Sequence, residues 1–195
     1  MSIITLTTDF GLKDHFAGIF KGKIYSLLPE TNIVDLSHSI DKFNVLEASY
    51  LLSVSYSHFP KGTVHIVAVD ASRNADTTHI AMLFDGHYFI GADNGIFGGL
   101  INKRNPDKIV QITIHDRLID GSSDLDVFAT VATHLAKGGE MTVIGSPVTE
   151  IKKRNMLVPI LDQNLNSIRG HIVYIDDFGN CVTNISKKYI EEIAK

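Results

Sequence analysis

Short β-branched runs alternate with segments of helical spacing over residues 1–154, and this alternation limits the possible folds more than any other feature. Strands are predicted at residues 3–8, 32–36, 63–69, 79–84, 88–92 and 109–114, and helices at 14–28, 45–57 and 125–137. Such alternation is typical of parallel strands joined by helices, and Asp85-Gly86 between two strands indicates an inserted hairpin. We therefore predict an α/β fold, a three-layer α/β/α domain with a mixed sheet.

The pattern changes near residue 155, where a second module is predicted to begin. The chain then shows strands and turns, in MLVPIL, IRGHIVYID and CVTNI. A stretch of about 40 residues is too short for an independent core. We expect residues 1–154 to be the α/β/α domain and residues 155–195 the beginning of an incomplete β domain. Within the first domain, residues 141–144 are predicted as a further strand and the glycine-rich residues 95–99 as a backbone turn.

Charge and composition narrow the classes of partner and compartment. The net charge of −4 gives no reason to expect nucleic acid. No apolar stretch approaches the length of a membrane span, and the start of the chain lacks a signal-peptide pattern. The single cysteine, Cys181, is expected to be a small buried side chain, and it fits a reducing compartment. The expected location is the cytoplasm, with neither a membrane nor a nucleic acid as partner.

Acidic and amide side chains recur where the predicted strands end. They are Asp9, Asp35, Asp70, the pair Asp93-Asn94, Asp176 and Asn180. In α/β sheets, ligands bind at the carboxyl ends of the strands. A single Asp at such a place is more often a turn residue or a helix cap. The repetition nevertheless predicts a small-molecule site led by Asp9.

Motifs of other common sites are missing from the sequence. The nine histidines show neither H-x-x-x-H nor H-E-x-x-H spacing, so no metal site is predicted, and His79, His87 and His134 are interpreted as surface or packing residues. A Walker loop, G-x-G-x-x-G and G-x-S-x-G are also absent. Nucleoside triphosphates, dinucleotides and serine hydrolysis are therefore disfavoured.

Several segments together resemble one enzyme family. They are TLTTDFGLKDHFAGIFKGKIYSLLPE, VDLSH, FPKGTVHIVAVD, ADNGI, DVFATVATHLAKGG and IDDFGNCVTNIS. In this order they are similar to motifs of the S-adenosylmethionine hydroxide adenosyltransferases, which are adenosine-forming hydrolases related to fluorinating and chlorinating enzymes. The resemblance implies an α/β/α N-terminal domain, a C-terminal β-barrel and a homotrimer. It also implies hydrolysis of S-adenosylmethionine to adenosine and methionine, with S-adenosylmethionine as substrate and no cofactor.

The resemblance assigns roles to seven residues, and Ser123 is a further candidate. As a catalytic residue it implies Asp70, which would position the water. Ser123, the second catalytic candidate, could hydrogen-bond that water or cap the helix that follows. As substrate-binding residues the resemblance implies Asp9 at the ribose hydroxyls, Phe43 behind the ribose, Asn94 in the ADNGI motif, Asp176 at the methionine amino group, and Phe178 and Asn180 at the adenine.

The sequence departs from the family pattern at two catalytic positions. Thr77 stands where the family has an arginine, and Ser123 stands where it has a histidine. Arg73, His115 or Arg117 could supply a substitute cation, or they could be surface charges. A binding protein that recognises adenosine without turnover is therefore the alternative. A halogenase is a weaker alternative, because Asp70 would repel a halide.

Overall fold

The computed structural model describes residues 2–101, 104–153, 158–162 and 166–193. The chain divides into two compact units, Met1–Arg154 and Asn155–Lys195.

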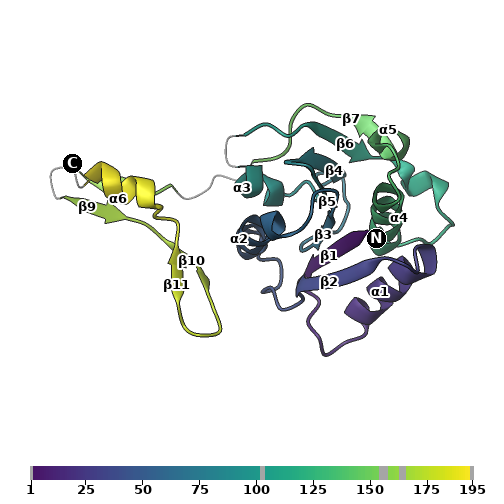
Figure 1. The fold of residues 1–195 in the computed structure, drawn as a ribbon, viewed down its shortest axis with the longest axis horizontal. Coiled ribbons are helices and arrows are strands. Elements are labelled where there is room, and N and C mark those ends of the chain that lie inside the picture. The colour runs from purple at the N-terminus through teal and green to yellow at the C-terminus, as the bar shows by residue number, and fades with distance from the viewer. Residues whose placement is uncertain (1, 102–103, 154–157, 163–165, 194–195) are drawn as a thin grey trace. The chain divides into compact units, whose positions relative to one another are not determined.

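Within the described residues, the first unit contains a seven-stranded mixed sheet with strand order β2-β1-β3-β5-β4-β6-β7 (Figure 1). The strands are β1 (Ile3–Thr8), β2 (Asn32–Ser37), β3 (Val64–Ala68), β4 (His79–Phe84), β5 (His87–Ala92), β6 (Lys108–Ile112) and β7 (Gly145–Pro147). Strands β2, β1, β3 and β5 run parallel, with Ile4 opposite Val64 where β1 pairs with β3. Strand β4 is antiparallel to β5 and β6, and β7 is antiparallel to β6.

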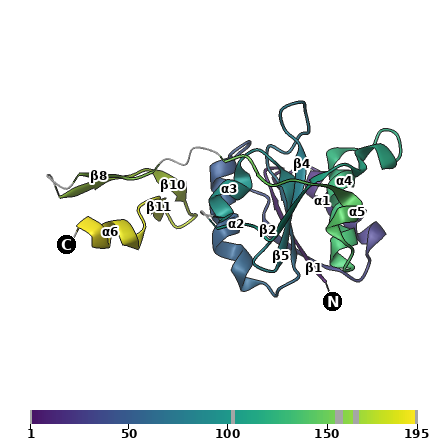
Figure 2. The same cartoon turned by 90° about the horizontal axis from the view of Figure 1, so that it is seen from above.

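Helices cover both faces of this sheet (Figure 2). On one face lie α1 (Phe16–Leu27), α4 (Asp124–Ala136) and α5 (Met141–Ile144), which pack against a core that includes Leu6, Ile66 and Phe128. On the other face lie α2 (Val45–Ser55), followed by the 3₁₀ turn η1 (Tyr56–His58), and α3 (Ile96–Ile101). A second 3₁₀ turn, η2 (Ile114–Arg117), precedes α4. The predicted three-layer α/β/α arrangement with a mixed sheet is confirmed. No helix among the described residues is both long and apolar enough to span a membrane.

Local sequence accounts for the hairpin and for two helix starts. Asp85 and Gly86 both have positive φ, of 52° and 73°, as the two-residue turn between β4 and β5 requires. Asn44 caps α2, because its side chain accepts a hydrogen bond from the Glu47 amide. At the start of α4, the Ser123 amide donates to Asp126 Oδ2 at 2.8 Å.

Two local predictions are wrong. Residues 141–144, predicted as a strand, form helix α5, and the edge strand β7 begins only at Gly145. The glycine-rich residues 95–99, predicted as a turn, lead into helix α3, whose Ile96 and Phe97 are buried against the sheet. Residues 141–144 are a short, mostly apolar run, and residues 95–99 hold Ile96 and Phe97 between glycines. The conformation of such short stretches depends on the surface that they cover.

The second unit consists of two hairpins and a helix within the described residues. Strands β8 (Ile160–Asp162) and β9 (Ser167–Arg169) form one pair, β10 (Ile172–Ile175) and β11 (Cys181–Thr183) form the other, and α6 (Lys187–Ile193) follows. Residues 156 and 157 of the predicted strand MLVPIL lie outside the described residues. Cys181, predicted to be buried, is exposed.

Candidate functional site

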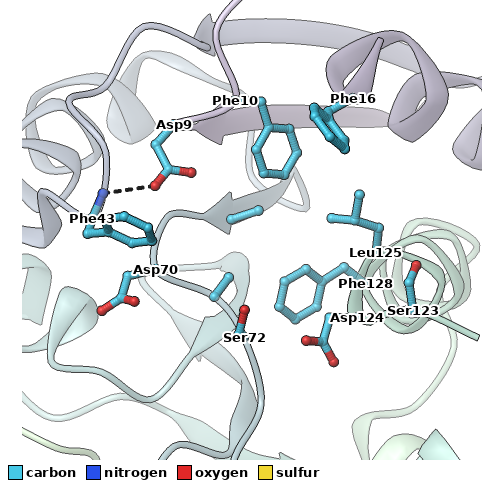
Figure 3. A pocket seen from close by; sticks show the side chains of 12 residues that line it. Asp9, Phe10, Phe16, Phe43, Asp70, Ser72, Ser123, Asp124, Leu125 and Phe128 are labelled. Carbon is cyan, nitrogen blue, oxygen red and sulfur yellow. Dashed lines mark hydrogen bonds between the residues drawn. The ribbon is translucent and has the colours of Figure 1, made fainter. Parts of the chain in front are cut away.

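A pocket of about 330 Å³ lies at the carboxyl ends of β1 and β3 in the first unit (Figure 3). Its wall combines carboxylates and serines with aromatic side chains. It is lined by Asp9, Phe10, Phe16, Phe43, Ala68, Asp70, Ala71, Ser72, Ser123, Asp124, Leu125 and Phe128. Four residues predicted from the sequence, at positions 9, 43, 70 and 123, therefore line one cavity.

Asp9 and Phe43 lie side by side on one side of the pocket in Figure 3. The Phe43 amide donates to Asp9 Oδ2 at 2.9 Å, which fixes the carboxylate and leaves Oδ1 for a ligand. Phe43 has a φ of 63°, in the left-handed region that non-glycine residues seldom adopt. Phe43 is 67% exposed, so the pocket holds an aromatic residue open to an incoming molecule.

Asp70 also has a left-handed backbone, with a φ of 47°. The side chain of Asn94 supports this conformation, because its Nδ2 donates to the carbonyl oxygens of Val69 and Asp70 at 3.1 and 3.0 Å. Asn94 Oδ1 accepts from the Ile96 amide. Asn94 is not among the residues that line the pocket, and its amide group is occupied by backbone. Strained backbone of this kind gathers at functional sites.

Ser123 lies at the opposite side of the pocket, at the start of α4 (Figure 3). Its Oγ donates to Asp126 Oδ2 at 2.7 Å, so its lone pairs can accept a hydrogen bond from a ligand. Burial acts to raise the pKa of Asp126, but hydrogen bonds from Lys23 and Ser123 outweigh it and hold this pKa below its usual value. Ser123 therefore both lines the cavity and belongs to the helix cap.

A polar cluster that sequence reasoning missed lies against the pocket beside Phe128. His79 is fully buried, and its Nε2 is 2.8 Å from the Ala71 carbonyl oxygen and 3.9 Å from Asp124 Oδ1. Its Nδ1 is 3.2 Å from His115 Nε2. Burial lowers the pKa of both histidines, and the positive charge of Arg73 adds to this effect. Both rings are therefore neutral near pH 7.

The candidate cations from the sequence occupy different places. The Arg73 amide donates to Asp124 Oδ2 at 3.1 Å, and its guanidinium charge acts on His79 and His115. Arg117 instead donates to the Val143 carbonyl oxygen, away from the pocket-lining residues. Arg73 and His115 thus belong to the polar cluster, and no local sequence pattern marked His79 or Asp124 as their partners.

Asp35 and Asp93, two further strand-end carboxylates, have structural contacts instead of lining the pocket. Asp35 contacts Lys21 and His38, at 2.5 and 3.0 Å. Burial acts to raise the Asp35 pKa, but the hydrogen bonds from these two partners lower it overall. Asp93 Oδ1 accepts from the Lys152 amide at 2.8 Å, and burial raises the pKa of Asp93.

Asp176, Phe178 and Asn180 form a compact turn between β10 and β11 in the second unit. Asp176 Oδ1 accepts from the amides of Phe178 and Asn180 at 3.0 and 2.8 Å. Its Oδ2 accepts from Asn180 Nδ2 at 2.8 Å, and these bonds, led by that from Asn180, lower the pKa of Asp176. The turn leaves Phe178 91% exposed. This unit therefore presents an aromatic ring next to a fixed carboxylate.

The chemistry of the pocket suits a positively charged ligand with a flat apolar part. Among the described residues that line it, three side chains are carboxylates and none is basic. Phenylalanine rings supply apolar surface and can attract cations through their faces. Within the described ranges, no three His, Cys, Asp or Glu side chains gather as a set of metal ligands.

Family models match both parts of the chain. The model described as the SAM hydroxide adenosyltransferase N-terminal domain matches residues 4–145, and the model for the C-terminal domain matches residues 170–195. The chain is 29% identical to the (R)-S-adenosyl-L-methionine hydrolase of Methanocaldococcus jannaschii, in a match that covers 96% of this chain and 68% of that protein. It is 26% identical to the protein of the same name from Salinispora tropica, with 98% and 75% covered.

A fluorinase and a solved structure are also similar to the chain. The fluorinase of Nocardia brasiliensis is 21% identical, and the match covers 98% of this chain and 74% of that enzyme. The crystal structure of an uncharacterized conserved protein from Thermotoga maritima superposes with a TM-score of 0.88 at 29% identity, covering 99% of this chain and 74% of that one.

Proposed function

Because this chain belongs to the S-adenosylmethionine hydroxide adenosyltransferase family, we propose that it hydrolyses S-adenosyl-L-methionine to adenosine and L-methionine. Water attacks the ribose C5′, the C5′–O bond forms as the C5′–S bond breaks, and the electron pair of the broken bond goes to sulfur. One proton from the water is released. The leaving thioether is neutral, so the reaction needs no general acid. It needs a bound substrate, a positioned water and a group that favours loss of the proton.

The acidic, aromatic pocket is the observation that carries this proposal. The sulfonium of S-adenosylmethionine is a cation, and the carboxylates of Asp9 and Asp70 in the pocket wall attract it. During the reaction, positive charge moves from the sulfur to the attacking water. A carboxylate close to that water therefore stabilises the transition state more than the ground state.

We assign substrate binding to both units. In the first unit, Asp9 Oδ1 would accept hydrogen bonds from the ribose hydroxyls while Phe43 packs against the sugar. In the second unit, Asp176 would bind the methionine amino group, with Phe178 and Asn180 at the adenine. The support is the fixed carboxylate of Asp9 and the exposed ring of Phe178.

We assign the water to Asp70 and Ser123. Asp70 would orient it and take its proton, and Ser123 Oγ would accept its second hydrogen, since the Ser123 hydroxyl proton is already donated to Asp126. Asn94, expected to bind substrate, would act through the backbone of Asp70, because its side-chain amide is bonded there.

The direct test is incubation with S-adenosylmethionine in oxygen-18 water, followed by chromatography and mass spectrometry. The expected result is methionine together with adenosine that carries oxygen-18 at its 5′ position. Adenosine binding without any product would contradict the proposal and would favour a binding protein. A chlorinated nucleoside formed only with added chloride would instead indicate halogenation.

A matched pair of variants tests Asp70. Asn tolerates the left-handed backbone that Asp70 adopts, so Asp70→Asn removes the charge with the least backbone change. We expect a loss of turnover on the order of 10²–10⁴-fold. The control is Asp120→Asn, at an exposed carboxylate outside the pocket, which should keep the parent rate. Equal rates in the two variants would refute the role of Asp70.

We further propose a homotrimer located in the cytoplasm. The trimer follows from the family resemblance, and the compartment from the presence of a single cysteine. Light scattering coupled to size-exclusion chromatography measures the mass in solution. A monomer mass together with full turnover would show that activity does not require the trimer. Fluorescent labelling of the protein in cells tests the proposed compartment.

A further inference from the structure

The loop that carries Asp70 is held by side chains from three other parts of the chain, namely strand β4, helix α4 and the turn after β5. This segment, residues 70–73, is called the Asp70 loop below. At its first residue, Asn94 Nδ2 donates to the Asp70 carbonyl oxygen. At the second, His79 Nε2 lies 2.8 Å from the Ala71 carbonyl oxygen. At the fourth, the Arg73 amide donates to Asp124 Oδ2 at 3.1 Å. These contacts hold the loop at three of its four residues.

The hydrogen-bond partners determine the protonation of His79. A carbonyl oxygen only accepts, so His79 Nε2 carries the hydrogen that bonds to Ala71. In a neutral ring Nδ1 is then the acceptor, and it receives the hydrogen of His115 Nε2. Burial lowers the pKa of His79 and favours this neutral form, although Asp124 acts in the opposite direction. Among the described residues, the charge of Arg73 also acts on the ring and lowers its pKa.

We infer that His79 and Asp124 are positioning residues for Asp70, which they serve by holding the Asp70 loop at Ala71 and at Arg73. The inference rests on the role proposed for Asp70 above. His79 Nε2 and Asp124 Oδ1 are 3.9 Å apart, so the two holding groups lie next to each other. His79 comes from the start of β4, and Asp124 from the first residue of α4. Together they join the loop to the sheet and to the helix.

The left-handed backbone of Asp70 explains why the contacts of His79 and Asp124 with the loop are needed. Asp70 has a φ of 47°, a conformation that Asp adopts more readily than most residues but still only occasionally, so a free loop would move toward ordinary backbone angles. That movement would turn the carboxylate away from the water that it is proposed to hold. The binding of ribose by Asp9 and Phe43 would be unaffected, because their hydrogen bond does not involve the loop. Loss of the holding contacts should therefore lower kcat and leave KM nearly unchanged.

Two pairs of variants separate positioning from other roles. His79→Leu removes the donor to Ala71, whereas His79→Gln keeps an amide N–H at a similar reach. Asp124→Ala removes the acceptor for the Arg73 amide, whereas Asp124→Asn keeps an acceptor oxygen. We expect kcat for adenosine formation to fall about 10- to 100-fold in His79→Leu and Asp124→Ala, as small misplacements of catalytic groups do. The kcat of His79→Gln and of Asp124→Asn should stay within about threefold of the parent value. The affinity for adenosine, measured by calorimetry, should be the same in all four variants and in the parent.

The outcomes distinguish this inference from the proposed function. A parent protein that makes no adenosine refutes both. A parent that turns over beside equally active His79→Leu and Asp124→Ala variants refutes the inference alone. Equal losses in Asp124→Ala and Asp124→Asn would show that the charge of Asp124 acts on the substrate, and would also refute positioning. If His79→Leu fails to fold, the comparison of Asp124→Ala with Asp124→Asn tests the inference. The Asp124 side chain is 35% exposed, so its replacement should leave the fold intact.

Discussion

His65 lies buried in β3, where its Nδ1 is 2.8 Å from Thr5 Oγ1 and its Nε2 is 3.1 Å from His87 Nδ1. Burial, and then the nearby charge of His87, lowers its pKa from 6.5 to about 3. The unfolded chain thus binds a proton that the folded protein excludes. The stabilisation from neutral His65 is complete above pH 6.5 and is lost as the pH falls toward 3. From these two pKa values, His65 alone should lower the free energy of unfolding by about 2 kcal/mol between pH 7 and pH 5.

Urea denaturation at pH 7 and at pH 5 measures this loss. The variant His65→Gln cannot titrate in this range, so its loss between the two pH values should be about 2 kcal/mol smaller than that of the parent. The control is His15→Gln, at an exposed histidine, which should leave the pH dependence of the parent unchanged. If His65→Gln loses as much stability as the parent, the burial argument for His65 is wrong.

Substitutions at three further positions test the backbone near the pocket and at the sheet edge. Phe43→Val should lower the free energy of unfolding by about 1–2 kcal/mol in urea, because a β-branched residue resists the φ of 63°, whereas Phe43→Asn should cost less. Asn94→Ala should cost about 1–3 kcal/mol in thermal unfolding, since two carbonyl oxygens lose their donor. Gly145→Ala should cost about 3 kcal/mol or more and expose β7 to hydrogen exchange, because its Cβ would lie 1.9 Å from the Gln111 carbonyl oxygen.

The sequence predicted the parts of the fold that local signals determine. Asp85-Gly86 adopts positive φ at both positions, so the hairpin between β4 and β5 follows from two adjacent residues. Residues 63–69 form a nearly continuous apolar run, and β3 is buried along its length. Residues 141–144 are also apolar, but they became a helix, because a four-residue run fits either structure and its neighbours decide.

The candidate site was predictable only where it coincides with strand ends or with the family resemblance. Asp9 and Asp70 follow parallel strands, so the sheet itself brings them to one edge. His79 and Asp124 are 45 positions apart, and only the packing of α4 on the sheet brings them together. The left-handed backbone of Asp70 could not be predicted from the sequence either, because the side chain that supports it, Asn94, follows a different strand.

The pocket takes its walls from distant parts of the chain, and this has a consequence for synthesis on the ribosome. Asp9 and Asp124 are 115 positions apart, which at translation rates of 5–20 residues per second corresponds to roughly 6–23 s. During that time, Phe20 and Ile24 of α1 lack the cover that Val131 of α4 later gives to the same core. The emerging chain therefore presents an apolar sheet face suited to binding by a chaperone. The helix that completes the pocket is also the one that ends this exposure.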